Sequence, residues 1–338
     1  MVDTTIQPGW ITAALRASLL GYGRILSQYG TNQPLFSKGV EGGVDACTSL
    51  DKELERDTRS YLSKETGIPC FGEEEGGSKD SELLWILDKI DGTPNWRSGI
   101  PCFGSAVALA RGDEPIINAI LLPALGEIYV AMKGQGSHFI DIGRINREAN
   151  TYANNLRGII QKNRKLGRRL STFQEAIESI EQCLVDEVMG AWNAKDANDA
   201  ISQLEPILET DPKKMQFGTD LGYKDRFKKL QKMGSFSDDV FYCPVLGSAS
   251  FSLCQVAAGK LGGYWIPDVD INDTYPGSLL VTEMGGIVTD QKRNPMIRTS
   301  TGLVAGANKE LYQFLMLCLE SFRDIYGMPF MIDPCLAR

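Results

Sequence analysis

Apolar residues recur every three to four positions in several stretches of the chain, which is the spacing of a buried helix face. One such stretch covers residues 9–29 and closes on Gly30, and a second runs from Asp51 to about Lys64, just before Gly67. A glycine directly after a periodic stretch is typical of a helix end. We therefore predict one helix in each of these two stretches.

Shorter apolar runs between turn residues predict strands. The run from Leu83 to Leu87 is fully apolar, as in a buried strand, and residues 102–141 have the pattern of an antiparallel meander. From Val245 onward, helices are predicted over 244–263, 277–284 and 308–326, with strands over 285–290 and 302–306. Alternately stacked helix and sheet layers are the simplest arrangement, so the expected fold class is α/β (α+β).

The composition changes between residues 147 and 212. Basic residues gather over 157–169, and Ser171 with Gln174 then has the spacing of a capping box at the start of an amphipathic helix. We interpret this segment as a helical insertion. The expected organisation is an N-terminal half (1–146), the insertion (147–212) and a C-terminal half (213–338) that completes the site.

Composition and charge restrict the class of protein. Of 338 residues, 43% are hydrophobic and 23% are charged, which suits a globular protein with its own core. The net charge of −8 argues against nucleic acid or an anionic membrane surface as the main partner. The eight cysteines form no CxxC pair, and no signal-peptide pattern is present, so we expect a reduced, cytoplasmic protein.

The single histidine, His138, excludes several kinds of active site. A phosphohistidine enzyme, a Ser-His-Asp hydrolase and a histidine-rich metal site are all difficult to build around it. We interpret His138 as a structural residue at the end of a strand.

Acidic residues in four separate places are the best indication of chemistry. They are Asp51, Glu73, the pair Asp88 and Asp91, and Asp273. The pair stands at the end of the predicted strand, with the Ile90 carbonyl between them and a turn at Gly92. Carboxylate and carbonyl oxygens are the ligands that Mg²⁺ prefers, and amides near Thr93 at a helix start suit a phosphate.

These residues stand in motifs that resemble the inositol monophosphatase family, part of the lithium-sensitive, Mg²⁺-dependent phosphatase superfamily that also includes fructose-1,6-bisphosphatase. The motifs are Thr48-Ser49-Leu50-Asp51, Gly72-Glu73-Glu74, the run from Trp85 to Trp96 that contains Asp88-Lys89-Ile90-Asp91-Gly92-Thr93, Gly247-Ser248-Ala249, Asp273, and Glu283-Met284-Gly285-Gly286. The similarity covers about residues 1–145 and 213–325. It implies a layered αβαβα sandwich of the sugar-phosphatase type.

The resemblance also implies roles for particular residues. Glu73, Asp88, Asp91, Asp273 and the Ile90 carbonyl would bind two to three Mg²⁺ ions. Asp51 and Thr93 would orient and deprotonate the attacking water that the metal ions activate. Gly92, Thr93, Gly247, Ser248 and Ala249 would bind the phosphate and the rest of the substrate. The resemblance implies that no phosphoenzyme forms. It also implies a homodimer.

The chain departs from the family pattern at positions that bear on specificity. Lys89 replaces the usual proline, and we interpret it as a solvated turn residue. Ile266 stands near the position of an acidic residue that holds an inositol hydroxyl, and Pro244 replaces an arginine.

The substrate therefore stays open, although the metal-ligand set is complete. We expect a phosphomonoesterase acting on a small phosphorylated polyol or sugar, with inositol 1-phosphate as the default. A sugar bisphosphate or a 3′(2′),5′-bisphosphate nucleotide is the alternative, with basic residues of the insertion holding the second phosphate. A non-catalytic metal- or phosphate-binding protein is the alternative of another class.

Overall fold

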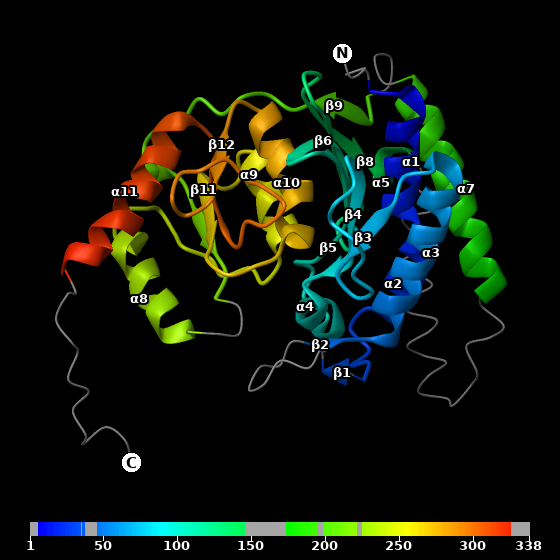
Figure 1. Ribbon diagram of the computed structural model, residues 1–338, viewed down its shortest axis with the longest axis horizontal. Coiled ribbons are helices and arrows are strands. Elements are labelled where there is room, and N and C mark those ends of the chain that lie inside the picture. Colours follow the sequence, from blue (N-terminus) through cyan, green and yellow to red (C-terminus); the bar gives the residue numbers. More distant parts are fainter. Residues whose placement is uncertain are drawn as a thin grey trace.

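The computed structural model describes residues 6–34, 36–37, 46–145, 174–194, 199–221 and 225–325. Helices and sheets alternate across this part of the chain in five layers, which confirms the predicted αβαβα sandwich (Figure 1). None of its helices is both long and apolar enough to cross a membrane.

The larger sheet has seven strands in sequential order from β3 to β9. The strands are β3 (Cys70–Gly72), β4 (Leu83–Asp91), β5 (Gly104–Arg111), β6 (Glu114–Leu122), β7 (Glu127–Met132), β8 (Ser137–Asp141) and β9 (Ile201–Gln203). All neighbours pair antiparallel except β3 and β4, which are parallel. The predicted meander is confirmed, and β4 continues through Asp91, four residues beyond the predicted strand.

Four helices cover one face of this sheet: α1 (Pro8–Leu19), α2 (Tyr22–Gln28), α3 (Ser49–Thr66) and α7 (Gln174–Asn193). The single helix predicted over 9–29 is wrong, because the chain breaks at Gly21, whose φ is +87°. A Cβ at Gly21 would lie 2.0 Å from Leu54 Cδ2. Close approach of α3 therefore requires glycine at this break.

The start of α3 also differs from the expected one. Thr48 is the N-cap, and Asp51 is the third helical residue rather than the first. The Asp51 carboxylate accepts a hydrogen bond from the Thr48 backbone amide at 3.0 Å, which is half of a capping box.

Part of the segment 147–212 is built into the N-terminal half. Leu184 and Val188 of α7 pack into the same core cluster as Trp85 of β4, and β9 extends the large sheet. The basic stretch 157–169 and Ser171 lie outside the described residues. The boundaries of the insertion therefore stay a prediction.

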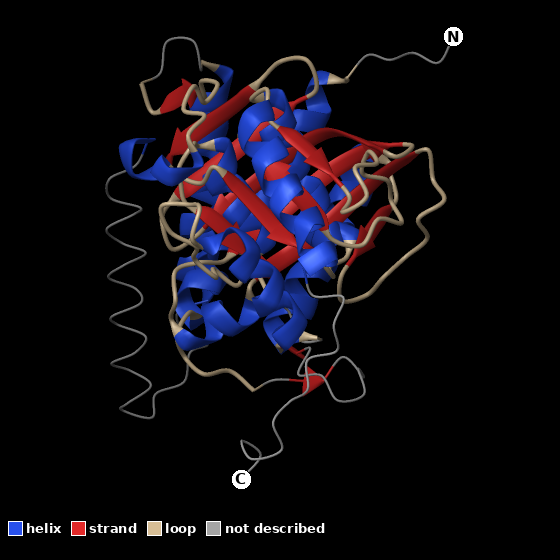
Figure 2. Cartoon of the chain, turned by 90° about the vertical axis from the view of Figure 1, so that its left-hand side faces the viewer, coloured by secondary structure: helices blue, strands red, loops and turns tan. Residues whose placement is uncertain are grey.

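The smaller sheet has the order β10, β11, β13, β12, with strands β10 (Phe217–Thr219), β11 (Gly263–Ile266), β12 (Ile287–Thr289) and β13 (Leu303–Gly306). Helices α9 (Ala249–Ala257) and α10 (Ile271–Glu283) lie between the two sheets, and α8 (Arg226–Ser237) and α11 (Lys309–Ile325) cover the far side. Figure 2 shows these helices lying over the strands from that side.

Helix α10 begins six residues before the predicted helix, so Asp273 lies in its first turn. Pro276 inside the helix cannot donate a backbone hydrogen bond, which normally disfavours a helix interior. Tyr275, Leu279 and Leu280 are all buried, and the burial of this face outweighs the local preference.

Further short elements complete the described chain. They are β1 (Phe36–Ser37), β2 (Ala46–Cys47), α4 (Thr93–Ser98), α5 (Ile142–Ile145) and the 3₁₀ helix η3 (Pro212–Lys214).

Candidate active site

A bulge in β4 brings two acidic side chains to the same pocket. In a regular strand, residues three apart point to opposite faces. The pairing of β4 with β5 shifts register between Asp88 and Asp91, which marks a bulge that re-aims side chains. Both aspartates line the pocket, and so does Ile90, which also packs in a core cluster with Trp96.

Glu73 follows β3, and its loop is held by a buried glutamate of α3. The Glu55 carboxylate accepts the backbone amides of Glu74 at 2.7 Å and Glu75 at 3.1 Å. A Cβ on Gly72 would lie 2.0 Å from Glu55 Oε1, so this approach requires a glycine before Glu73. Sequence reasoning did not identify Glu55, which stands in an otherwise ordinary amphipathic helix.

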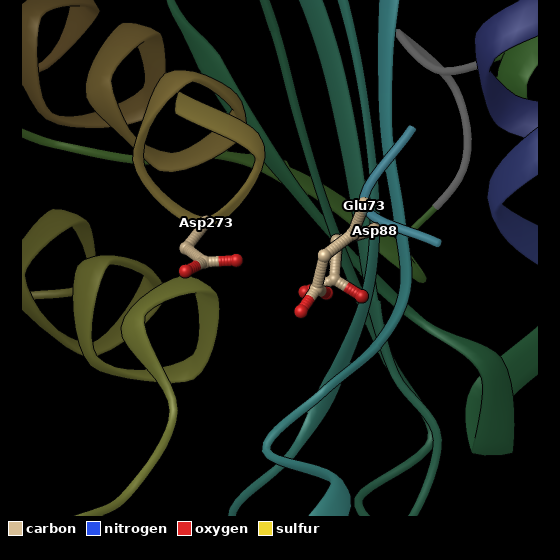
Figure 3. Close-up of side chains that lie close together, drawn as sticks. All are labelled: Glu73, Asp88 and Asp273. Carbon is tan, nitrogen blue, oxygen red and sulfur yellow. The ribbon is translucent and has the colours of Figure 1, made fainter. Parts of the chain in front are cut away.

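Three of the predicted metal ligands converge from both halves of the molecule. Carboxylate oxygens of Glu73, Asp88 and Asp273 all lie within 4.8 Å of one another. Figure 3 shows Glu73 and Asp88 side by side on the large sheet, with Asp273 facing them from α10. Three negative charges this close repel, and a divalent cation bound to their oxygens offsets that repulsion. The residues present therefore fit Mg²⁺.

Asp91 lines the same pocket but is also held by the start of α9. Its Oδ2 accepts the Ser248 hydroxyl at 2.7 Å and the Ser250 backbone amide at 2.5 Å. Burial raises the pKa of Asp91, while these hydrogen bonds lower it. Its predicted role as a metal ligand stays a prediction, and the contact shows how the C-terminal half is joined to β4.

Asp51 and Thr93, the predicted catalytic pair, are in contact. The Thr93 hydroxyl lies 3.0 Å from Asp51 Oδ1 and 3.0 Å from the Ile90 carbonyl oxygen, the predicted carbonyl ligand. Both side chains are buried. Burial raises the pKa of Asp51, an effect that the hydrogen bonds from Thr48 partly offset.

The predicted phosphate-binding residues form two helix starts that meet. Gly92 precedes α4 with φ +87°, and a Cβ there would come within 3.1 Å of the Gly247 carbonyl and 3.0 Å of Ser248 Cβ. Ser248 is the N-cap of α9, which begins at Ala249. Gly92, Thr93, Gly247, Ser248 and Ala249 all line the pocket. Their contact with phosphate stays a prediction.

Lys89 is not a solvated turn residue, so that interpretation is wrong. It is only 3% exposed and points away from the pocket. Its Nζ donates to the Ala17 carbonyl at 2.5 Å and lies 3.4 Å from the Ser18 carbonyl, at the end of α1. Burial lowers the pKa of Lys89 to about 7, although the nearby Glu181 carboxylate opposes this effect.

The remaining pocket wall contains a buried aspartate that sequence reasoning missed. Asp220 follows β10 and accepts the Gly247 amide at 2.5 Å and the Tyr264 hydroxyl at 2.6 Å. Burial raises its pKa to about 6, and repulsion from Asp91 acts in the same direction. The three residues before it, Phe217-Gly218-Thr219, form β10 but show no apolar run that predicts a strand.

The pocket is a cavity of about 920 Å³ with charges of both signs beyond the metal ligands. Arg226 and Lys229 of α8 line it, together with Val245 and Ile266. Lys229 forms an ion pair with Asp268 at 3.0 Å. His138 lies away from this pocket in β8, where its ring packs edge-on against Trp192.

Comparison with known proteins adds to this geometry. The sequence model of the inositol monophosphatase family matches residues 10–191 and 179–321. An inositol-1-monophosphatase from Rhizobium meliloti is 28% identical over 254 residues, covering 74% of either chain. The Nus factor SuhB of Pasteurella multocida is 25% identical over 282 residues, covering 82% of this chain and 84% of that protein.

Solved structures share the fold. The extragenic suppressor protein suhB from Bartonella henselae superimposes with a TM-score of 0.68 over 94% of this chain and 99% of that chain, at 21% identity. An IMPase from Thermotoga maritima gives a TM-score of 0.66 over 91% of this chain and 96% of that chain, at 19% identity. These similarities confirm the architecture.

Proposed function

Because the chain belongs to the inositol monophosphatase family, we propose that it is a Mg²⁺-dependent phosphomonoesterase for a small phosphorylated polyol or sugar. Family membership makes it a hydrolase of phosphate monoesters. The identity of the metal, the roles of the individual residues and the substrate class are what we propose. The observation that carries it is the convergence of Glu73, Asp88 and Asp273 within 4.8 Å at one wall of the pocket.

The oxygen ligands of this site suit two to three Mg²⁺ ions. Glu73, Asp88 and Asp273 would hold them, with Asp91 and the Ile90 carbonyl as further ligands. When bound, the ions supply positive charge that polarises the phosphoryl group and stabilises the attacking and leaving oxygens. The protein then needs no nucleophilic side chain, because water attacks phosphorus directly.

Thr93 and Asp51 would prepare that water. The Thr93 hydroxyl donates to Asp51 Oδ1 at 3.0 Å, which leaves its oxygen free to accept a proton from water. Asp51 is the group that finally receives the proton, and its raised pKa makes it a better base than an exposed aspartate. Backbone amides of Gly92 and Thr93, at the start of α4, would hold phosphate oxygens.

The size and lining of the pocket favour a small polar substrate. About 920 Å³ is at the upper end of ordinary small-molecule sites. The Asp220 carboxylate can accept hydrogen bonds from substrate hydroxyls. Ile266 can form no side-chain hydrogen bond at the position where the family resemblance places an acidic residue. Inositol 1-phosphate therefore remains the first substrate to test rather than the expected best one.

A bisphosphate substrate is the second candidate, favoured by one observation. Arg226 and Lys229 line the pocket beyond the metal carboxylates. Lys229 is paired with Asp268 at 3.0 Å. Arg226 is the side chain that we propose for a second phosphate. The basic stretch that first prompted this alternative lies outside the described residues.

Phosphate release from a substrate panel tests the proposal. Inositol 1-phosphate, fructose 1,6-bisphosphate and 3′-phosphoadenosine 5′-phosphate are each incubated with Mg²⁺ or with EDTA. We expect release that EDTA abolishes, and that Asp91→Asn lowers by about 10²-fold or more. Asp186→Asn, an exposed aspartate on α7, is the matched control and should leave release unchanged.

The pattern of release separates the candidates. Preference for doubly phosphorylated substrates supports the bisphosphate candidate, and preference for inositol 1-phosphate supports the first. If wild-type protein releases no phosphate from any member of the panel, the proposal is wrong, and a non-catalytic metal- or phosphate-binding protein is the better description.

The homodimer and the cytoplasmic location also stay proposals. Phe227 and Leu230 of α8 and Phe241 after it are exposed apolar side chains that a second copy of the chain could bury. Light scattering should then give about twice the chain mass of 37.2 kDa, and Phe227→Asp with Phe241→Asp should halve it. A monomer at all concentrations would contradict the dimer. Fluorescence from a tagged chain checks the location.

A further inference from the structure

Lys89 lies on the opposite side of β4 from the pocket. Along this strand, Trp85 and Leu87 pack into the core beneath α1, and Leu84 and Ile86 pack toward Tyr275 of α10. Regular alternation then gives Asp88 to the pocket and Lys89 to the helix side. Figure 1 shows α1 lying along that helix side of the large sheet.

The bulge makes Lys89 and Ile90 two successive residues with buried side chains, and of the two only Ile90 lines the pocket. A bulge leaves an extra residue outside the regular ladder, so other contacts must fix its geometry. The Ile90 side chain is fixed by apolar packing with Leu54 and Trp96. Lys89 cannot be fixed in that way, because its ammonium group needs polar partners.

The end of α1 supplies those partners. The last carbonyls of a helix lack N–H donors inside it and carry partial negative charge. Lys89 Nζ donates to Ala17 O at 2.5 Å and lies 3.4 Å from Ser18 O. The Ser105 hydroxyl of β5 also donates to Ser18 O at 3.2 Å, so the helix end, β4 and β5 are joined at one point.

A carboxylate of α7 lies near the buried charge. Glu181 Oε1 accepts the Gly21 amide at 2.5 Å, directly after α1 ends, and is close enough to act electrostatically on Lys89. The Lys89 contact therefore combines a helix end, a counter-charge and a fixed chain break. Such a set holds a side chain in one position.

We propose that Lys89 is a positioning residue of the active site, because its contact with the end of α1 fixes the bulge that places Asp91 in the same pocket as Asp88. The inference rests on the proposed metal-dependent function. Lys89 touches neither substrate nor metal, and it acts through the direction of the two neighbouring carboxylates. Loss of the contact should therefore weaken metal binding first.

The test compares Lys89→Met with wild type. Methionine keeps the length and most of the volume but cannot donate to the α1 carbonyls. Residues that support metal ligands typically contribute 10- to 100-fold to metal affinity. We expect the dissociation constant for Mn²⁺, measured by electron paramagnetic resonance without substrate, to rise about 10-fold or more. At saturating Mg²⁺, KM for the phosphomonoester should change little.

Arg298→Met is the matched control. Arg298 is another buried cation, and its guanidinium donates to the carbonyls of Lys79 at 2.8 Å and Glu82 at 3.1 Å, at the opposite end of β4. Its loss should lower the melting temperature but leave the Mn²⁺ dissociation constant unchanged. If Lys89 had a purely structural role, Lys89→Met would also lower the melting temperature and leave the Mn²⁺ dissociation constant unchanged.

Folded Lys89→Met with wild-type Mn²⁺ affinity overturns the inference, whatever its melting temperature. If Lys89→Met does not fold, Lys89→Gln carries the test. Glutamine is polar but uncharged and one atom shorter, so it weakens the contact with the α1 carbonyls, and an unchanged Mn²⁺ affinity there also overturns the inference. Wild type that binds Mn²⁺ but hydrolyses nothing would disprove the proposed function alone. Wild type that binds no Mn²⁺ would disprove both.

Discussion

At the scale of single residues, Asp51 contributes to both folding and the proposed chemistry. One carboxylate oxygen accepts the Thr48 amide at the start of α3, and the other accepts the Thr93 hydroxyl from the start of α4. Capping therefore uses one oxygen and leaves the other to Thr93, so the cap is compatible with the proposed catalytic use.

Replacing the Thr93 hydroxyl tests this pair. Thr93→Val removes the hydroxyl but keeps the shape, and we expect kcat to fall about 10²-fold, within the usual range for proton transfer. KM should change little, because binding does not depend on the hydroxyl proton. Thr93→Ser keeps the hydroxyl and is the control. Equal losses in the two variants, measured by steady-state kinetics, would contradict the role.

Asp220 should make stability depend on pH. Its pKa is about 6 in the folded protein and 3.8 without burial, so ionisation is disfavoured in the folded state. Below pH 4, Asp220 is protonated in both states and does not lower the free energy of unfolding. Between pH 4 and 6, its ionisation lowers that free energy by a growing amount. The shift of about 2 units corresponds to about 3 kcal/mol at most.

Asp220→Asn removes that cost. In EDTA, the melting temperature of this variant relative to wild type should rise between pH 4 and pH 7, because only wild type must ionise a buried acid. Asp290→Asn is the control, since Asp290 lies on the surface and its hydrogen bonds lower its pKa. A difference that stays constant with pH would contradict the assignment.

At the scale of elements, breaks and bulges decide where the site residues lie. The bulge in β4, the break at Gly21 and the early start of α10 were not predicted, although the elements around them were. Periodicity identifies an element from one buried face, but each of these features depends on a neighbouring element. Gly21 is needed because Leu54 of α3 lies against it, which no local pattern in residues 9–29 shows.

The break between α1 and α2 can be tested with two glycines. Gly21→Ala places a Cβ 2.0 Å from Leu54 Cδ2 at a positive φ, and we expect a loss of about 1–3 kcal/mol of unfolding free energy. Gly190→Ala lies in α7 with open space around it, and we expect a gain of up to about 1 kcal/mol. Urea unfolding measures both. Equal effects would contradict a steric requirement at Gly21.

At the scale of the whole molecule, the candidate site lies between the large sheet and helices of the C-terminal half. The order and spacing of the acidic motifs predicted the αβαβα fold and the convergence of Glu73, Asp88 and Asp273, because a shared family pattern encodes long-range contacts. Asp220, Glu55 and the burial of Lys89 could not be predicted. Each acts through a partner distant in sequence, and its residue type is common on protein surfaces.

Metal binding across the two halves should stabilise the entire chain. Asp273 belongs to α10, whereas Glu73 and Asp88 belong to the large sheet, so a bound cation joins them. At a Mg²⁺ concentration 100 times the dissociation constant, the gain is about 2.7 kcal/mol. Calorimetry should show a melting temperature several degrees higher than in EDTA. Asp273→Asn should lose most of this increase, whereas Asp186→Asn should keep it.

The most direct test of the account is anomalous diffraction from a crystal soaked in Mn²⁺. The account predicts anomalous peaks in the pocket, with at least one ion within about 2.5 Å of carboxylate oxygens from the Glu73, Asp88 and Asp273 cluster. A well-diffracting soaked crystal with no peak among these three carboxylates would contradict it.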